Sequence, residues 1–336
     1  MQARADALDR EAAFPSEEVD RLRRAGALSP PLPVAGSGTA DELAALLILV
    51  GQGNLSVGRV LEAHVNAQHL IARYGKRPDD GRLYALWVTD PPVNGLRMRR
   101  RGNVIALSGG KQFCSGAGHA TGALVTAQDE DGTTRMLVFP LGIGEVVHPL
   151  PSPLAGMRAA VTGTVDFTGC EVAAGALLGD PDAYLREPDF SAGAWRGSAV
   201  ALGGLIALID HGVTSLRDSG RIRSPHAEAR VGQAMIARET SRLWVSAAAR
   251  VAEDPAADII YRISTVGLAR IAVETACLDA MQLIQRSLGL SSFRQGTPIE
   301  RICRDLSTYL RQPAPDEVLT EAATWFANHP DAAVVS

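Results

Sequence analysis

The sequence predicts a mainly α-helical protein with one β-rich domain in its middle. Helical periodicity fills about the first 80 residues and returns after about Ala199, whereas Leu83 to about Gly179 consists of short β-branched and aromatic runs separated by Gly, Asp and Pro. A chain of 336 residues can bury two or three cores. We therefore expect a helical domain at 1–82, a β-domain at 83–180, a helical bundle at 181–328 and a loose tail at 329–336.

Helix-start signals divide the first domain into three helices. A serine followed by two glutamates at 16–18 supplies a cap and first-turn carboxylates. Thr39–Glu42 is a capping box ahead of an apolar run that reaches about Val50. After a glycine-containing turn at 51–54, a third helix is expected over 56–74.

Turn residues divide the middle stretch into antiparallel strands. Asp131-Gly132, between two apolar runs, predicts a β-hairpin. Val104–Ser108 is an apolar run closed by glycines, which is typical of a buried strand that enters a tight turn. For Arg97–Arg101 we favour a solvated edge strand, whose charges discourage aggregation, over a phosphate-binding site.

Two long apolar helices dominate the C-terminal part. On the first, one face carries Ile236, Leu243, Ala247 and Val251. The second, over 258–288, is apolar on more than one side and should be buried on several sides. Helices of this length suit a four-helix bundle that also packs against another subunit, so we expect a homodimer or homotetramer.

Charge and composition exclude several classes of protein. The formal net charge of -4 gives no reason to expect a nucleic acid partner. The N-terminus lacks the apolar core of a secretory signal, and the longest apolar stretch, Ala199–Ile209, is about half the roughly 20 residues that a membrane-spanning helix needs. His64 and His69 lie about 140° apart on a helix, and the cysteines lack metal-ligand spacing. We expect a soluble cytoplasmic protein without a metal site.

A motif runs through the stretch from Val104 to Gly118. Its order of strand, Gly-Gly-Lys, aromatic residue, small hydroxyl residue and glycine resembles the central β-domain of the FAD-dependent acyl-CoA dehydrogenase family, where a Gly-x-Lys-x-Trp-Ile-Thr-Asn segment lies along the flavin ring. Phe113 takes the place of the family's tryptophan, and Ser115 that of its threonine. The strand before Pro91 resembles the family's Thr-Glu-Pro strand on the other flank of the flavin. The resemblance therefore implies FAD contacts from these two segments, namely from Trp87, Val88, Thr89, Phe113, Cys114 and Ser115.

The order of motifs continues along the chain. Gly156–Phe167 resembles the end of the family's β-domain, and Pro298–Asp305 resembles its late helix. The resemblance covers most of the chain. It implies a fold of N-terminal helices, an antiparallel β-barrel or sandwich, and a C-terminal four-helix bundle.

Other segments of the family have weaker counterparts. The family's loop that contacts the CoA arm is reduced to a turn ending at Gly95. Arg196 is a further candidate for substrate binding, because a planar guanidinium suits carboxylates and phosphates. The flavin diphosphate would be reached by Arg221 or Arg223, Gln285 and Gly289.

The family's catalytic glutamate has no counterpart in this sequence. Counting from Arg304 lands on Pro313, and the family's variant position falls at about Gly197. A dehydrogenase of this type needs a carboxylate, because the α-proton is removed while a hydride goes to the flavin. Replacement bases are sought on the linker before the bundle and just past Pro313, and the candidates are Glu187, Asp189, Asp316 and Glu317.

Three functions stay open. The first is an FAD-dependent oxidoreductase that removes an α-proton from an acyl thioester or a similar acyl substrate and transfers a hydride to flavin; neither its use of CoA nor its electron acceptor is identified. The second is a flavin monooxygenase on the same fold, which lacks the glutamate because oxygen reacts with reduced flavin and no α-proton is removed. The third is a partner subunit without catalytic activity.

Overall fold

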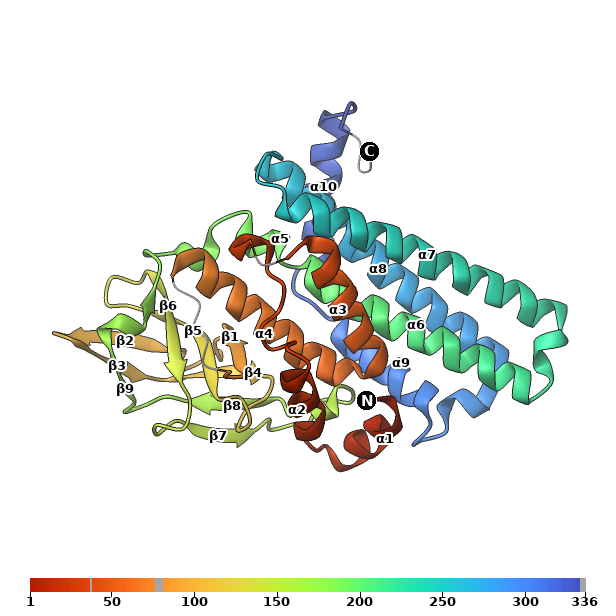
Figure 1. Cartoon of the computed structure of the whole chain (residues 1–336), viewed down its shortest axis with the longest axis horizontal. Coiled ribbons are helices and arrows are strands. Elements are labelled where there is room, and N and C mark those ends of the chain that lie inside the picture. The colour runs from red at the N-terminus through yellow and green to blue at the C-terminus, as the bar shows by residue number, and fades with distance from the viewer. Residues whose placement is uncertain (37, 76–80, 333–336) are drawn as a thin grey trace.

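Helices flank the β-strands in chain order in the computed structural model (Figure 1), which describes residues 1–36, 38–75 and 81–332. Helices come first, strands follow between Tyr84 and Leu178, and longer helices complete the chain. The predicted fold class is confirmed. The predicted loose tail 329–336 lies partly outside the described residues, and the last helix ends before it, at Asn328.

The N-terminal part holds four helices among the described residues: α1 (Gln2–Glu11), α2 (Ser16–Arg24), α3 (Ala40–Gly53) and α4 (Leu55–Tyr74). The sequence patterns did not predict α1. The predicted serine cap of α2 is wrong, because Pro15 occupies the cap position and no side chain caps this helix. The capping box of α3 is confirmed, since Thr39 Oγ1 accepts from Glu42 N at 3.2 Å while a Glu42 carboxylate oxygen accepts from Thr39 N at 2.8 Å.

α3 continues as a helix through Gly51 and Gly53, where the sequence predicts a turn. Gly51 lets it approach α6 (Trp195–Asp218), since a Cβ at Gly51 would lie 2.4 Å from Val200 O, and Gly53 faces the side chain of Met1. Both glycines therefore serve close packing rather than a change of direction. Asn54 separates α3 from α4 and caps α4 by accepting a hydrogen bond from Ser56 N at 2.9 Å.

The strands form two sheets that share one apolar core. Residues of both sheets contribute to this core, among them Val125 and Val165. The seven-stranded sheet has the order β10 (Leu177–Leu178), β6 (Thr134–Pro140), β5 (Gly122–Gln128), β2 (Arg97–Arg101), β3 (Val104–Ser108), β9 (Glu171–Ala173), with β1 (Tyr84–Trp87) beside β5. The three-stranded sheet has the order β4 (Gly110–Cys114), β8 (Gly163–Asp166), β7 (Val146–Pro149).

The larger sheet is mixed, whereas the sequence predicts antiparallel pairing. β1 pairs with β5 in parallel, with Tyr84 opposite Gly122, because the chain between them returns to the end of the sheet where β1 starts. The predicted hairpin is confirmed as the antiparallel β5–β6 pair. β2 is solvated as predicted, although it lies between β5 and β3 and meets β5 only at Arg97.

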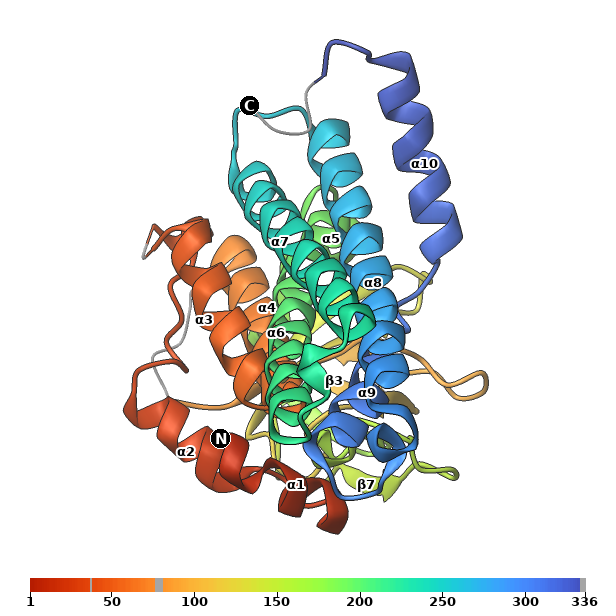
Figure 2. The ribbon, with the colours of Figure 1, turned by 90° about the vertical axis from the view of Figure 1, so that its right-hand side faces the viewer.

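The C-terminal part is a helical bundle in which α6 contacts α7, α8 and α9 (Figure 2). Its further helices are α5 (Asp189–Ala192), α7 (Pro225–Glu253), α8 (Ile259–Leu288), α9 (Pro298–Tyr309) and α10 (Pro315–Asn328). The stretch Asp189–Asp218, which contains the apolar run Ala199–Ile209, is long and apolar enough to span a membrane by length and composition alone. Within the fold, 67% of its apolar window is buried, as in the core helix of a globular bundle.

α7 turns a different face inward from the one that hydrophobicity predicts. Ile236 and Leu243 are 69% and 52% exposed, whereas Val245, Ala248 and Ala252 are buried. Small side chains line the buried side because α7 packs along α8 over its length. The larger apolar side chains of Ile236 and Leu243 stay on the outer surface. The predicted burial of α8 is confirmed.

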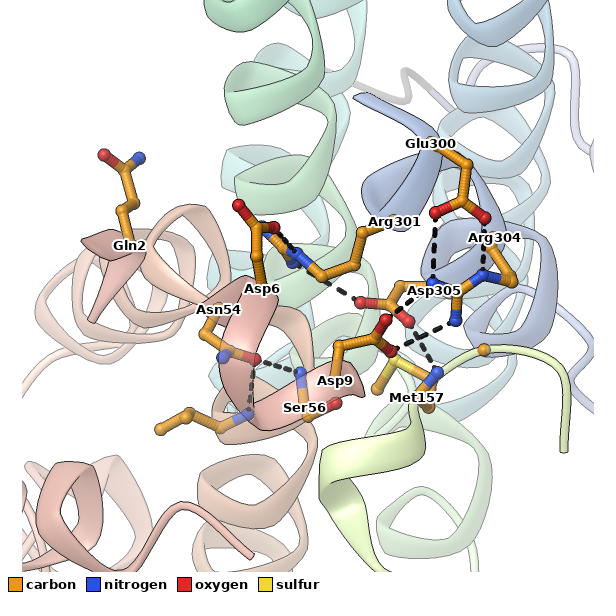
Figure 3. A network of polar contacts seen from close by, with 12 residues as sticks. Gln2, Asp6, Asp9, Asn54, Ser56, Met157, Glu300, Arg301, Arg304 and Asp305 are labelled. Carbon is orange, nitrogen blue, oxygen red and sulfur yellow. Dashed lines mark hydrogen bonds and ion pairs between the residues drawn. The ribbon is translucent and has the colours of Figure 1, made fainter. Parts of the chain in front are cut away.

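Ion pairs attach α1 to α9 (Figure 3). Arg301 Nε donates to Asp6 at 2.7 Å, and the two terminal nitrogens of Arg304 donate to the Asp9 carboxylate at 3.1 and 2.6 Å. Asp305, only 2% exposed, accepts a hydrogen bond from the backbone N–H of Met157 at 2.6 Å. The Arg-Asp pair at 304–305 thus joins the N-terminal helix, α9 and the end of the β-domain.

Asp305 is expected to make folding stability fall as the pH rises. Burial raises the pKa of Asp305 to about 6, although the Met157 N–H and Arg301 favour its charged form. A carboxyl group whose pKa is higher in the folded than in the unfolded state stabilises the fold in its protonated form, and this contribution is lost as the pH rises through about 6. Relative to Asp305→Asn, the wild type should gain about 1 kcal/mol in unfolding free energy between about pH 7 and pH 5.

Urea unfolding of both proteins at the two pH values checks this prediction. Asparagine keeps an acceptor for Met157 N, so the variant preserves the contact and removes the titrating group. An unfolding free energy that changes equally in both proteins would contradict the assignment to Asp305.

Candidate flavin site

The ends of β1 and β4 lie side by side. Gln112 N donates to Thr89 O at 2.9 Å, and Trp87 Nε1 donates to Ser115 O at 3.0 Å. Thr89 is exposed and Ser115 is half-buried. We call Val88–Thr89 together with Phe113–Ser115 the cradle, because these are the two segments that resemble the flavin-contacting strands.

Phe113 is the exposed aromatic side chain of the cradle. Its φ of 54° is unfavourable for a residue with a side chain, and the β4–β8 register shifts at this point. The side chain is 51% exposed. Strained backbone that presents an apolar ring to solvent indicates a ligand site, because neither feature stabilises the fold. The residues fit a flavin, whose ring has an apolar face for Phe113 and polar edges for the hydroxyls of Thr89 and Ser115.

Other predicted flavin contacts lie beneath this surface. Trp87 and Cys114 are 2% and 0% exposed and pack in the core of the β-domain. Burial raises the pKa of the Cys114 thiol to about 12, so it stays neutral and serves packing. Val88 is half-buried and presents its carbonyl to Lys111.

Lys111 joins the two segments of the cradle from inside. Its side chain is fully buried, and Nζ donates to Asp90 at 2.7 Å, to Thr126 Oγ1 at 3.0 Å and to Val88 O at 3.3 Å. Burial lowers the pKa of Lys111, and Asp90 counteracts that shift. The lysine of the sequence motif is therefore a structural residue that positions β1 against β4.

One face of α4 carries polar residues from the cradle to the surface. We call Arg59, Glu62, Asn66, His69 and Arg73 the α4 stripe; they recur every three or four residues and so share one helical face. At its inner end Arg59 Nε donates to Ser115 Oγ at 3.4 Å. Arg59 also pairs with Glu62, and the Asn66 amide donates to the other oxygen of Glu62. The spacing was visible in the sequence, but the partners on other elements were not.

Arg196 lies in the middle of the stripe's contacts and is 3% exposed. Its guanidinium donates to Asn66 Oδ1 at 3.1 Å, to His69 Nδ1 at 2.9 Å and to Glu253 at 2.5 Å. Because His69 Nδ1 accepts, its Nε2 carries the proton and faces Asp189. The residue that the sequence offers as a substrate ligand is thus engaged by three protein partners.

Asp189, a candidate base, lies at the outer end of the stripe. It accepts hydrogen bonds from His69 Nε2 at 3.4 Å, Arg73 Nε at 3.2 Å and Tyr74 Oη at 3.1 Å. Burial opposes its ionisation, but the hydrogen bond from His69 and the charge of Arg73 outweigh burial and lower its pKa to about 2. A carboxylate held in this way accepts a proton poorly.

The other candidate bases are exposed. Glu187 accepts from Ser191 N at 3.1 Å. Asp316 and Glu317 lie in the first turn of α10, which Figure 1 shows away from the β-strands. The structure brings neither residue to the cradle.

Tyr309 is a site residue that the sequence reasoning missed. It ends α9 and lies beside Gly197, where the family's variant glutamate would stand: a Cβ at Gly197 would be 3.5 Å from Tyr309 Oη. Burial and the negative charge of Glu62 raise the pKa of Tyr309 well above its ordinary value. The other family position, Pro313, is exposed and accepts a hydrogen bond from Arg270 at its carbonyl. No sequence signal linked Tyr309 to Gly197, since the two are far apart along the chain.

The proposed diphosphate contacts lie elsewhere in the chain. Arg221 Nη1 donates to Leu288 O at 2.8 Å, next to Gly289 at the end of α8. Arg223 is exposed, and Gln285 is half-buried. These residues lie at the end of the bundle remote from the strands (Figure 1), so they and the cradle of one chain cannot hold the same cofactor molecule.

An open groove of about 520 Å³ runs beside Gly95. Its lining begins at Pro91, two residues after Thr89, and includes the charged or titratable side chains of Arg97, His148 and Asp166. The hydrogen bond from Thr168 and, more weakly, His148 lower the pKa of Asp166. The groove therefore starts next to the cradle and presents both apolar and charged side chains.

No protein-family model matches the chain, and no curated protein matches it in sequence. Solved structures do match. Butyryl-CoA dehydrogenase from Megasphaera elsdenii superposes with a TM-score of 0.84 at 16% identity, over 97% of this chain and 94% of that one. The chain has the acyl-CoA dehydrogenase fold.

Two other structures with this fold have different activities or ligands. The methanesulfinate monooxygenase MsuC from Pseudomonas fluorescens superposes with a TM-score of 0.85 at 19% identity, over 98% of this chain and 94% of that one. KijD3, in complex with FMN and an amino keto sugar attached to dTDP, superposes with a TM-score of 0.82 at 20% identity, over 98% and 89% of the two chains. The acyl-CoA dehydrogenase fold thus carries both dehydrogenation and oxygenation, and the reaction must be argued from the site.

Proposed function

We propose that the protein is a flavin-dependent oxidoreductase whose flavin ring lies on the cradle. The exposed, strained Phe113 is the observation that carries this proposal. Bound flavin supplies two-electron redox chemistry. The chain's own residues hold it, with Phe113 against the ring and Thr89 and Ser115 at its edges. The cradle would contact the ring that FMN and FAD share, whereas the diphosphate of FAD would also need Arg221, Gln285 and Gly289 from a second copy of the chain.

Of the two reactions, we favour oxygenation. The two positions at which the family carries its base hold Pro313 and Gly197, and the side chain beside Gly197 is the Tyr309 hydroxyl. A monooxygenase reaction would consume two electrons from a reductant and two protons, with one atom of O₂ entering the substrate and the other leaving as water; bound flavin would supply the reactivity towards O₂. This reaction removes no α-proton, so it does not need a carboxylate at position 197 or 313.

Dehydrogenation of an acyl thioester is the second candidate, and Glu62 is the observation that favours it. Glu62 is a buried carboxylate, 6% exposed, whose partner Arg59 contacts Ser115. Both of its oxygens already accept hydrogen bonds, from Arg59 and Asn66, which weakens it as a base. The groove at Gly95 would then hold the thioester's handle.

We also infer that the protein works as a homodimer or homotetramer in the cytoplasm. The exposed Ile236 and Leu243 on α7 are an apolar surface of the kind that a second subunit covers. All four cysteines are free and buried, as suits a reducing compartment. Light scattering of the purified chain gives its copy number.

The visible absorption spectrum of the purified protein tests the proposal. Mass spectrometry of the released cofactor then identifies it. We expect an oxidised-flavin spectrum, and we expect Phe113→Gly to weaken flavin binding at least about tenfold, because the stacking surface is lost. Phe190→Ala is the control, since Phe190 is 49% exposed and lies outside the cradle. No flavin, even after reconstitution, would support a partner subunit without catalytic activity.

The two reactions are separated on the flavin-loaded protein. Dehydrogenation would be established if acyl-CoA thioesters bleach the flavin in the absence of oxygen and if this bleaching is lost in Glu62→Gln. Rapid reoxidation of the reduced protein by O₂, with none of the thioesters bleaching it, would establish the oxygen reaction.

A further inference from the structure

The Tyr309 hydroxyl is buried without a hydrogen-bond partner in the described part of the chain. Tyr309 is 6% exposed and ends α9 against the helical core. A buried polar group of this kind destabilises the fold unless something else pairs with it. It therefore indicates a ligand that the protein alone does not supply.

Gly197 leaves the hydroxyl without a side-chain neighbour from α6. Apart from backbone of the same helix, a Cβ added at Gly197 would meet only Tyr309 Oη within 4 Å among the described residues, at 3.5 Å, so no side chain fills the position between them. Gly197, Ser115 and Thr162 are each partly exposed, which gives access from solvent. Within the cradle, Ser115 Oγ lies 3.5 Å from Thr162 Oγ1 and accepts a hydrogen bond from Arg59 Nε at 3.4 Å.

Arg59 provides a second donor at the same place. Its Nε contacts Ser115 and its Nη1 pairs with Glu62, while Nη2 makes no hydrogen bond within the described ranges. The side chain is 29% exposed, so Nη2 can reach a ligand. Helix α4, which carries Arg59 and Glu62, contacts α9, which ends at Tyr309. Burial and the charge of Glu62 raise the pKa of Tyr309, and the charge of Arg59 lowers it.

Donors outnumber acceptors in this site. Tyr309 and Arg59 have N–H or O–H groups to offer, whereas both oxygens of Glu62 are already engaged by Arg59 and Asn66. The group that completes the site must therefore accept hydrogen bonds, and a guanidinium favours an anionic acceptor.

We propose that Tyr309 and Arg59 bind the carboxylate of a small polar substrate beside the flavin cradle. The inference rests on the proposed function for its position next to the flavin, and it specifies the substrate class. Charged side chains line the site, so a long alkyl chain gains no apolar contact there, in contrast to an acyl pocket.

Calorimetric titration of the full-length protein with sodium acetate and sodium benzoate tests the proposal, both as purified and after removal of flavin. We expect millimolar or tighter binding that weakens at least about tenfold in Tyr309→Phe. Gly197→Ala should weaken binding to a similar degree while raising Tm, because it fills the ligand's space and replaces a helical glycine. Tyr74→Phe is the matched control: it removes a hydroxyl that donates to Asp189, and binding should stay within about twofold.

A series from acetate to hexanoate separates this site from an acyl pocket. We expect nearly constant affinity, whereas an apolar pocket would gain about fourfold per buried methylene. Absence of carboxylate binding, equal binding by Tyr309→Phe, or a steady gain with chain length would each overturn the proposal. A protein that binds carboxylates but holds no flavin, even after reconstitution, would reject only the proposed function. A protein that holds flavin but binds no carboxylate, with or without the flavin, would reject only this inference.

Discussion

Replacement of Arg196 by alanine is expected to lower the unfolding free energy by about 3–5 kcal/mol, because it removes one partner of a buried ion pair. The Arg196 side chain is 3% exposed, and its partner Glu253 is 10% exposed. Without Arg196, the one donor to the Glu253 carboxylate that remains among the described residues is the Trp195 indole, at 3.2 Å, and His69 loses the donor to its Nδ1. The helices α4, α6 and α7 meet at this guanidinium, so the loss spreads over three elements.

Chemical denaturation of wild type and variant measures this effect, and Arg250→Ala is the matched control. Arg250 also forms an ion pair from α7, with Asp41, but the two side chains are 66% and 53% exposed. Solvent screens such a pair, so its loss should cost less than about 1 kcal/mol. If Arg196→Ala were no more destabilising than Arg250→Ala, the three contacts of Arg196 would not stabilise the fold as described.

Lys111→Ala is expected to destabilise the fold by about 2–4 kcal/mol and to release flavin, since it leaves a cavity and removes three hydrogen bonds. Lys111 is fully buried and holds Val88 O, Asp90 and Thr126 Oγ1 from the interior of the β-domain. Val88 belongs to one flank of the cradle, and Asp90 directly follows that flank in the sequence. Displacement of this flank should therefore lower flavin affinity by more than about tenfold, in addition to the loss of stability.

Lys111→Met separates packing from positioning. Methionine fills most of the volume, and Thr126 Oγ1 can still donate to Val88 O, at 3.4 Å in the wild type. We expect this variant to recover most of the stability of the wild type but to hold flavin less tightly, because Asp90 loses its buried partner. Equal flavin affinity in all three proteins, measured by titration of the reconstituted protein, would show that Lys111 does not position the cradle.

Local patterns in the sequence were sufficient for most helices and for the hairpin. The Thr39 capping box and the Asp131-Gly132 turn involve groups a few residues apart, and such contacts form in the same way in any fold. Helix α8 follows from its own hydrophobicity, because it is buried on several sides and nearly any orientation covers its apolar residues. The motif around Phe113 also lies within one short stretch.

The packing and pairing of elements whose partners lie far along the chain could not be predicted from local sequence patterns. Gly51 looks like a turn residue until α6 is placed against it, and Val200 lies about 150 residues away. The outer face of α7 is the more hydrophobic one in sequence, but close packing on α8 selects the smaller side chains. Parallel pairing of β1 with β5 likewise depends on the path of the chain between them.

The sequence by itself determined the succession of helices and strands, the Phe113 motif and the lack of a glutamate at 197 and 313, because each of these depends on neighbouring residues or on residue identity. Only the tertiary structure decided which side chains meet there. It placed Tyr309 beside Gly197, Arg59 against Ser115 and Arg196 among its partners on α4 and α7. The physical reason is that a side chain's partners, burial and pKa are set by elements more than 50 residues apart that the core brings together.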